Sequence, residues 1–187
     1  MLVRFREWLS ETIFPGRCVA CHRSLELFPG DEYACPTCRL ILSNPGGSFY
    51  PGASAAGTVA TPPHADHRGF AEIVAFPTPS RERDIVLSAS SRAHPRAQLL
   101  GAKTLASNLR LARIRVRSLT PLSPGADPGV AEYLAADLDV PLVGDPEGLT
   151  PTLLFADTID DRVRDRAARR MDHIRDSAIL LGGLVRY

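Results

Sequence analysis

This sequence lacks a long apolar run, a large net charge and a signal-peptide pattern, and each absence excludes a class of protein. No apolar stretch approaches the ~20 residues of a membrane-spanning helix. The formal net charge is +1, which excludes binding of DNA or anionic lipid by bulk charge alone. Without a signal peptide we expect a cytoplasmic location. Lysine is also scarce: Lys103 is the only one, so arginine supplies the other basic residues.

Cysteine occurs four times, in two Cys-x-x-Cys pairs. Cys18 and Cys21 form the first pair, and Cys35 and Cys38 form the second. A tight turn in each pair can point both sulfurs at one metal, so two pairs supply the four soft ligands of a tetrahedral Zn²⁺ site. The connector is predicted to be a small hairpin with its tip at residues 29–31. The pattern indicates a structural zinc ribbon at 17–42, since four protein ligands leave no coordination position for a substrate.

Three other uses of these cysteines stay open at the level of sequence. Two disulfides are one, although a reducing cytoplasm disfavours them. A redox Cys-x-x-Cys is the second, although it leaves the other pair unexplained. The third is attachment of a c-type haem, because residues 18–22 read Cys-Val-Ala-Cys-His, but that chemistry requires export. Structural zinc accounts for all four cysteines together.

Apolar periodicity and the positions of Pro and Gly divide the chain into four predicted parts. They are an N-terminal amphipathic helix at 1–16, the ribbon at 17–42, a linker or loop at 43–66, and an α/β domain at 67–187. The elements predicted in the last part are a short apolar segment at 69–76, strands at 84–91, 114–119, 152–158 and 178–185, and helices at 97–112, 130–138 and from 160 onward. The last strand, helix and strand form a βαβ unit, which is typical of a parallel sheet.

The two ends of the chain resemble the ComF-type competence proteins. A predicted short helix ends in Phe-Pro-Gly-Arg-Cys at 14–18, directly at the four-cysteine ribbon. Residues 153–159 (Leu-Leu-Phe-Ala-Asp-Thr-Ile) lie where the family has a strand of the form Leu-Leu-Val-Asp-Asp-Val, and residues 180–186 resemble the strand that closes its domain. The resemblance implies a phosphoribosyltransferase-like parallel-sheet domain after the ribbon. It also implies a link to natural competence and DNA uptake.

The same strand shows where this chain departs from the family. In the family, two acids contact the ribose of phosphoribosyl pyrophosphate (PRPP), and a following Thr-Thr-Gly-x-Thr loop holds the 5′-phosphate. Here Ala156 replaces the first acid, only Asp157 matches, and residues 160–164 read Asp-Asp-Arg-Val-Arg without a glycine. Backbone that wraps a phosphate favours glycine, and two carboxylates repel a phosphate dianion. We therefore expect no family-type PRPP binding, and Mg²⁺ only if PRPP binds. Asp157 is either a ribose-contacting remnant or a cap at the strand end.

These observations leave three hypotheses for function. In the first, the protein is a scaffold that binds nucleic acid or competence-related proteins, with contacts from Arg17, Arg23 and Arg39 around the ribbon. In the second, it is an active phosphoribosyltransferase with an altered phosphate loop and Asp157 at the ribose. In the third, the domain has lost its chemistry and is kept for an interaction alone. For any single one of the three arginines, a solvated surface residue is the favoured interpretation. No catalytic residue is assigned.

Overall fold

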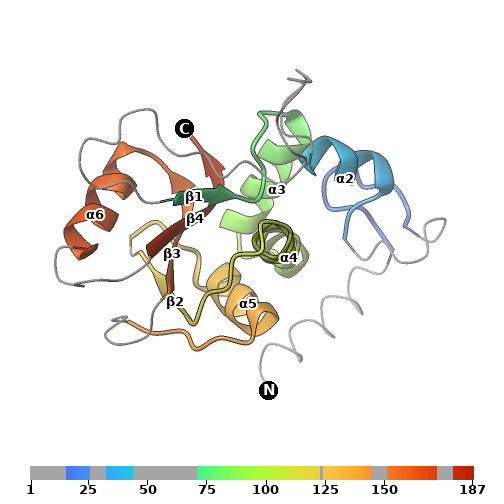
Figure 1. The fold of residues 1–187 in the computed structure, drawn as a ribbon. Coiled ribbons are helices and arrows are strands. Elements are labelled where there is room, and N and C mark those ends of the chain that lie inside the picture. Colours follow the sequence, from blue (N-terminus) through green and yellow to red (C-terminus); the bar gives the residue numbers. More distant parts are fainter. Residues whose placement is uncertain (1–15, 26–32, 44–70, 123, 145–150, 172–178) are drawn as a thin grey trace, which may run out of the picture.

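A four-stranded parallel sheet lies at the centre of the computed structural model, which describes residues 16–25, 33–43, 71–122, 124–144, 151–171 and 179–187 (Figure 1). Along the sheet the order is β1-β4-β3-β2. The strands are β1 at Ala71–Val74, β2 at Ser118–Pro121, β3 at Thr152–Ile159 and β4 at Ile179–Arg186. The helices are α2 at Pro36–Ser43, α3 at Arg81–Ser91, α4 at Pro95–Leu111, α5 at Pro128–Leu138 and α6 at Asp161–Met171.

Alternate side chains of β3 supply the two faces of the sheet. Leu153 and Phe155 belong to the larger core, which α4 and α5 share, whereas Leu154 and Ala156 belong to a smaller core with α6. Successive residues of a strand point to opposite faces, so an unbroken apolar run is the pattern of a strand buried on both sides. Figure 1 shows α6 on one side of the sheet and α3, α4 and α5 on the other. The result is a three-layer α/β arrangement.

The cysteine-containing segments pack on the outer side of α3 and α4, away from the sheet (Figure 1). We call residues 16–25 and 33–43 together the cysteine module. Tyr33 of the module is buried, and its ring lies 4.7 Å from the Lys103 ammonium and 5.7 Å from the Arg96 guanidinium, both on α4. Cation–π contacts of this kind are stronger where the partners are desolvated. They fix the module against the N-terminal half of α4.

The parallel βαβ unit is confirmed, and so are the two helices that precede it. The predicted helices at 97–112 and 130–138 are α4 and α5, and the strand, helix and strand at the end are β3, α6 and β4. Residues of β3 and β4 pair in parallel from Thr152 with Ile179 to Ile159 with Arg186. α5 begins at Pro128, slightly before the predicted start at 130, because Asp127 caps it and Pro128 takes the first helical position.

The strand predicted at 84–91 is wrong, since these residues belong to the helix α3. Ser80 lies in extended backbone, and its hydroxyl accepts the backbone N–H of Arg83 at 3.1 Å. Glu82 and Asp84 in the first turn favour a helix start electrostatically. The β-branched pair Ile85-Val86 suggested a strand, but the cap and the acidic first turn outweigh that intrinsic preference, which is weak.

Several further predictions need correction or lie outside the described residues. The strand predicted at 114–119 begins only at Ser118, and it continues to Pro121. The end of the predicted ribbon, residues 36–42, is part of the helix α2. The predicted helix at the N-terminus, the linker at 43–66 apart from Ser43, and the hairpin tip at 29–31 lie outside the described residues. Within the part of the chain that is described, no helix is both long and apolar enough to cross a membrane.

Candidate metal centre and adjoining cleft

The first cysteine pair lies in a tight turn closed by backbone hydrogen bonds. The Cys18 N–H donates to the Arg23 carbonyl at 2.8 Å, and the His22 N–H donates to the Cys18 carbonyl at 2.9 Å. Arg17 and Ser24 form an antiparallel bridge that joins the two ends of the turn. His22 has φ of 60°, in the left-handed region that glycine favours. The turn directs the sulfurs of Cys18 and Cys21 to the same side.

The second cysteine pair lies at the start of α2. Cys35 immediately precedes the helix, Pro36 occupies its first position, and Cys38 follows within the first turn. The Cys35 carbonyl accepts the Arg39 N–H at 2.9 Å as the first helical hydrogen bond. The N-terminus of a helix carries a partial positive charge that stabilises thiolates. A short helix therefore presents this pair, in place of a second β-turn.

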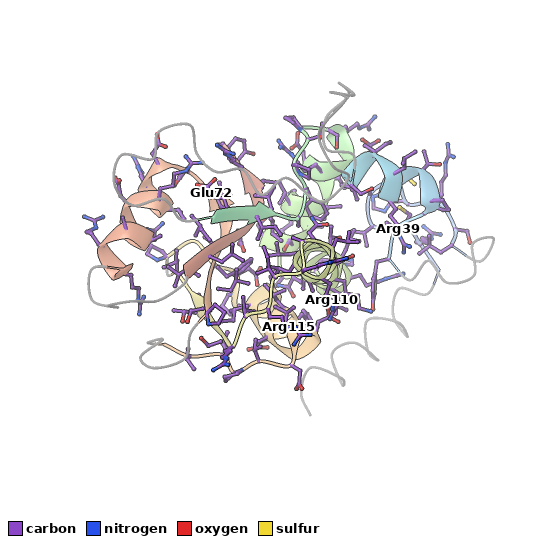
Figure 2. The ribbon with its side chains drawn as sticks, in the orientation of Figure 1. Arg39, Glu72, Arg110 and Arg115 are labelled. Atoms are coloured by element: carbon purple, nitrogen blue, oxygen red, sulfur yellow. The ribbon has the colours of Figure 1, made fainter. Side chains whose placement is uncertain are left out.

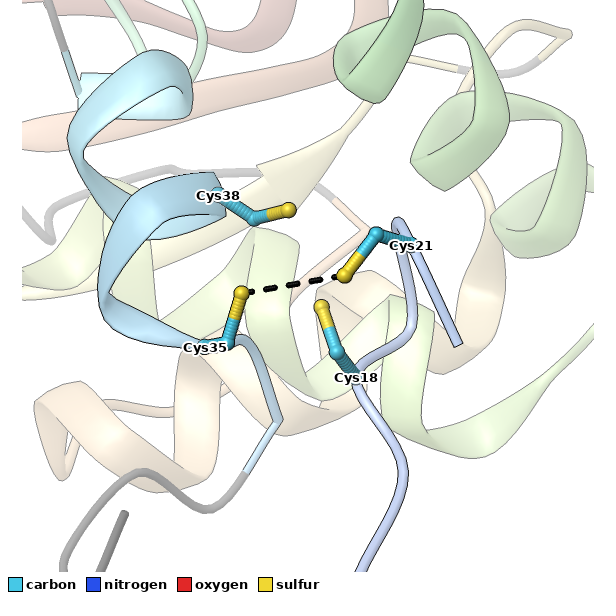
Figure 3. A group of neighbouring side chains, drawn as sticks. All are labelled: Cys18, Cys21, Cys35 and Cys38. Atoms are coloured by element: carbon cyan, nitrogen blue, oxygen red, sulfur yellow. Dashed lines mark hydrogen bonds between the residues drawn. The ribbon is translucent and has the colours of Figure 1, made fainter. Parts of the chain in front are cut away.

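The four sulfurs meet at one point (Figure 3). All lie within 4.8 Å of one another, and Cys21 Sγ is 3.7 Å from Cys35 Sγ. A regular tetrahedron with Zn–S bonds of about 2.3 Å has sulfurs about 3.8 Å apart, so the cluster fits a zinc ion after only small side-chain movements. All four cysteines are free thiols, as a metal site requires. Cys18, Cys21, Cys35 and Cys38 therefore gather in one cluster, as predicted, and this cluster could hold a metal ion such as zinc.

The protonation of these thiols also favours a cation at their centre. Burial raises the pKa of the Cys38 thiol above its usual range, and burial likewise raises that of Cys21. Burial also acts to raise the pKa of Cys18, but hydrogen bonds from the backbone of Cys35, Cys21 and Ala20 outweigh it, so that pKa is lowered. Four thiolates this close repel one another. A divalent cation removes the repulsion and deprotonates the remaining thiols.

Beside the metal ligands lies a cleft with a volume of about 1310 Å³, between the first cysteine turn and α3. We call it the cleft. Residues 16–19, His22 and Ser24 form one wall, α3 forms the opposite wall, and the start of α4 completes it. Among the described residues, its lining includes one acid, Asp84, two histidines, His22 and His94, and four arginines, Arg17, Arg81, Arg92 and Arg96. Burial lowers the pKa of His94, and the charges of Arg96 and His22 lower it further.

The three arginines predicted to contact nucleic acid all belong to the cysteine module. Arg17, Arg23 and Arg39 are exposed. Arg17 also lines the cleft, whereas Arg23 and Arg39 do not. Figure 2 shows Arg39 on α2, at the end of the molecule opposite Glu72. Their role as nucleic-acid contacts stays a prediction.

Asp157, the proposed ribose contact, holds the segment before α5 by hydrogen bonds. Its carboxylate oxygens accept the Asp127 backbone N–H at 3.0 and 3.1 Å, and its own N–H donates to the Gly125 carbonyl at 2.7 Å. Burial and, less strongly, the charge of Asp127 raise the pKa of Asp157 to about 6, although the Asp127 N–H acts to lower it. The Asp127 carboxylate in turn caps α5 and accepts both bonds from the Gln98 amide. Asp157 thus joins the end of β3 to the start of α5.

The segment after β3 lies where the resemblance predicts a phosphate loop. Its side chains form hydrogen bonds and ion pairs with other groups of this chain. The Asp160 carboxylate accepts the Val163 N–H at 2.8 Å, which occupies the start of α6. Arg164 binds Glu72 of β1 at 2.7 Å and Asp161 at 2.8 Å. The Glu72 side chain is 1% exposed, and Arg186 approaches its other oxygen at 3.4 Å. The start of α6 is therefore bound internally.

Comparisons of the chain with protein-family models, with curated proteins and with solved structures found no match. The ComF resemblance accordingly stays an expectation from the sequence. Sequence reasoning missed the cleft, whose cations come from three separate segments of the chain. The one local signal in the sequence was His22. It stands at the end of the first cysteine turn, where the backbone adopts a positive φ that glycine favours. The contributions of Arg81 and Arg92 depended on α3, which the sequence suggested was a strand.

Proposed function

We propose that the protein is a zinc-stapled α/β scaffold of the ComF type, with a phosphoribosyltransferase-like domain, and that its cysteine module binds nucleic acid. The observation that carries the proposal is the charge of the module's described surface. Residues 16–25 and 33–43 include three exposed arginines and no acid. Zinc held by four thiolates carries a formal charge of −2, but three of the four cysteines are buried. The described surface of the module therefore carries positive charge, as phosphate contacts require, while the acids Glu26, Asp31 and Glu32 of the connector lie outside the described residues.

The proposal gives the metal a structural role. Four cysteines complete a tetrahedral shell, so the ion would hold the turn at Cys18–Cys21 and the start of α2 together without meeting a substrate. The metal would thereby position Arg17 and Arg23 on one ligand turn and Arg39 on the other. A partner protein from the competence machinery, if one binds instead, would meet the same cationic face.

Scaffolding is a better proposal than phosphoribosyl transfer because of the contacts around β3. The oxygens of Asp157 accept a backbone N–H, and the N-terminal turn of α6 is capped by Asp160. A phosphate bound in the family manner would need that turn. Arg164, one of the two arginines of that turn, is held by Glu72. No separate observation favours an active transferase, and we expect no saturable PRPP binding with Mg²⁺.

The test is binding of a fluorescent single-stranded oligonucleotide to zinc-loaded protein over a range of salt concentrations. We expect the double variant Arg23→Glu/Arg39→Glu to bind at least about tenfold more weakly. Each lost phosphate contact should also reduce the slope of log K against log salt by about 0.7. Arg115→Glu is the matched control, because Arg115 is exposed and lies far from Arg39 (Figure 2). Absence of binding at low salt, or equal losses in the double variant and the control, would contradict the proposal.

A further inference from the structure

Tyr33 lies where the two cysteine-containing segments meet. It precedes Cys35 by two positions, and its carbonyl accepts the backbone N–H of Val19, the neighbour of Cys18, at 2.9 Å. This hydrogen bond joins the segment of the first cysteine pair to the segment of the second. Because neighbouring Cα atoms are only about 3.8 Å apart, a metal that fixes the four sulfurs also restricts the position of Tyr33.

The side chain of Tyr33 packs against α4. The residue is 3% exposed, and the Lys103 ammonium lies 4.7 Å from the ring centre and donates to the hydroxyl at 3.3 Å. The Arg96 guanidinium lies 5.7 Å from the ring centre. Arg96 and Lys103 are about two helical turns apart, so both lie on the same face of α4. A buried ring attracts cations more strongly than an exposed one, and Tyr33 therefore holds the module on this face.

The apolar side chains of the module and of α4 belong to one continuous core. Leu25 and Leu42 of the module are buried in the same cluster as Leu99 and Leu105 of α4. The module lies within residues 16–43, and chains shorter than about 40 residues usually need a metal, disulfides or a partner surface to fold. The fold of the module therefore depends on the metal and on α4 together.

We infer that Tyr33 and Lys103 couple the metal site to the α/β domain, so that zinc binding and docking of the module on α4 stabilise each other. Lys103 is then a positioning residue for a metal that it does not touch. The inference rests on the structural zinc of the proposed function, but not on nucleic-acid binding. Linkage makes the coupling reciprocal, so a change on α4 that weakens docking also weakens zinc binding.

The first test is the zinc affinity of Lys103→Met, measured by competition with a chromophoric chelator. We expect binding about tenfold weaker than in the wild type, because a desolvated cation–π contact and a hydrogen bond are both lost. Lys103→Arg keeps a cation at this position and should retain most of the affinity. Arg110→Met is the matched control on the same helix, because Arg110 pairs with Asp137 of α5 at 3.0 Å, and it should bind zinc as the wild type does.

The second test measures docking itself and uses the single lysine of the chain. Lys103 is the only side-chain amine, so peptide mass spectrometry after amine acylation reports its reaction rate separately from that of the N-terminal amine. Zinc-loaded wild-type protein should react at Lys103 at least about fivefold more slowly than zinc-depleted protein, the lower end of typical coupling. Zinc-loaded Tyr33→Leu should react at Lys103 faster than the zinc-loaded wild type, with circular dichroism showing that it is folded.

The outcomes separate this inference from the proposed function. Wild-type zinc affinity in Lys103→Met, or an equal weakening in Arg110→Met, would overturn the inference while leaving the structural zinc in place. Equal reaction rates at Lys103 with and without zinc would also overturn it. If Tyr33→Leu does not fold, the comparison of Lys103→Met with Lys103→Arg still decides. Failure of the wild-type protein to bind zinc would contradict both the structural metal and the coupling.

Discussion

The cysteine module and the segment that follows β3 differ in whether the side chains that could bind a ligand are already bound to other groups of the protein. In the module, four sulfurs converge and no side chain of the described chain is placed between them. After β3, the carboxylates of Asp157 and Asp160 and the guanidinium of Arg164 are all bound to neighbouring protein groups. The first region could hold a metal ion such as zinc. The side chains of the second are bound within the fold.

The largest effect is expected from loss of one metal ligand. Cys38→Ser replaces a thiolate with a poor zinc ligand, and a structural zinc site contributes about 10–16 kcal/mol of binding free energy to folding. We expect zinc to be lost on dialysis against a mild chelator and the free energy of unfolding to fall by at least about 3 kcal/mol. Metal analysis and urea denaturation measure the two effects. Thr37→Ser, at an exposed position between the two cysteines, is the matched control and should retain its zinc.

An intermediate effect is expected at Glu72, which joins β1 to α6 and β4. Glu72→Ala removes a buried carboxylate that two arginines share. Arg164 and Arg186 are partly exposed and can turn to water, so the loss should be about 2 kcal/mol, below the 3–5 kcal/mol typical of a fully buried pair. Urea denaturation measures the loss. Asp161→Ala breaks the other ion pair of Arg164, but Asp161 is 96% exposed, and about 0.5 kcal/mol or less is expected there.

Equal losses in Glu72→Ala and Asp161→Ala would mean that burial does not distinguish the two ion pairs of Arg164. The start of α6 would then not be held in the way described. The contrast between this segment and the cysteine module would be correspondingly weaker.

The smallest effect is expected at Asp157, and it depends on pH. Its pKa is raised from 3.8 to about 6, so the folded state favours the protonated acid. The wild-type protein therefore loses stability as pH rises through about 6, whereas Asp157→Asn has no charge to bury and keeps an oxygen for the Asp127 N–H. The free energy of unfolding of the variant minus that of the wild type should therefore be larger at pH 7.5 than at pH 5, by on the order of 1 kcal/mol. Thermal denaturation of both zinc-loaded proteins measures this.

A difference between Asp157→Asn and the wild type that stays constant from pH 5 to 7.5 would contradict the raised pKa. Loss of zinc at low pH affects both proteins alike, so it cancels in the comparison. The same variant also addresses the alternative function. If PRPP binds with Mg²⁺ and Asp157→Asn weakens that binding, Asp157 is a ribose contact, and the transferase hypothesis replaces the scaffold.

Sequence reasoning located the elements whose signals are local. The spacing of the four cysteines predicted one ligand set, and the unbroken apolar runs of β3 and β4 predicted a strand, helix and strand in parallel. It failed at α3, where Ile85 and Val86 favoured a strand and the cap at Ser80 decided otherwise. The partners of Asp157 could not be predicted, because the Asp127 N–H reaches it only when α5 packs beside the end of β3. The cleft could not be predicted either, because its arginines come from separate segments of the chain that meet only in the folded protein.

The most direct test of the account is X-ray absorption at the zinc edge on purified full-length protein. We predict one zinc per chain with four sulfur neighbours at about 2.3 Å and no nitrogen or oxygen ligand. That result would establish a closed structural site on which the cationic face and the cleft depend. Substoichiometric zinc, or a shell containing nitrogen or oxygen in place of one sulfur, would contradict it.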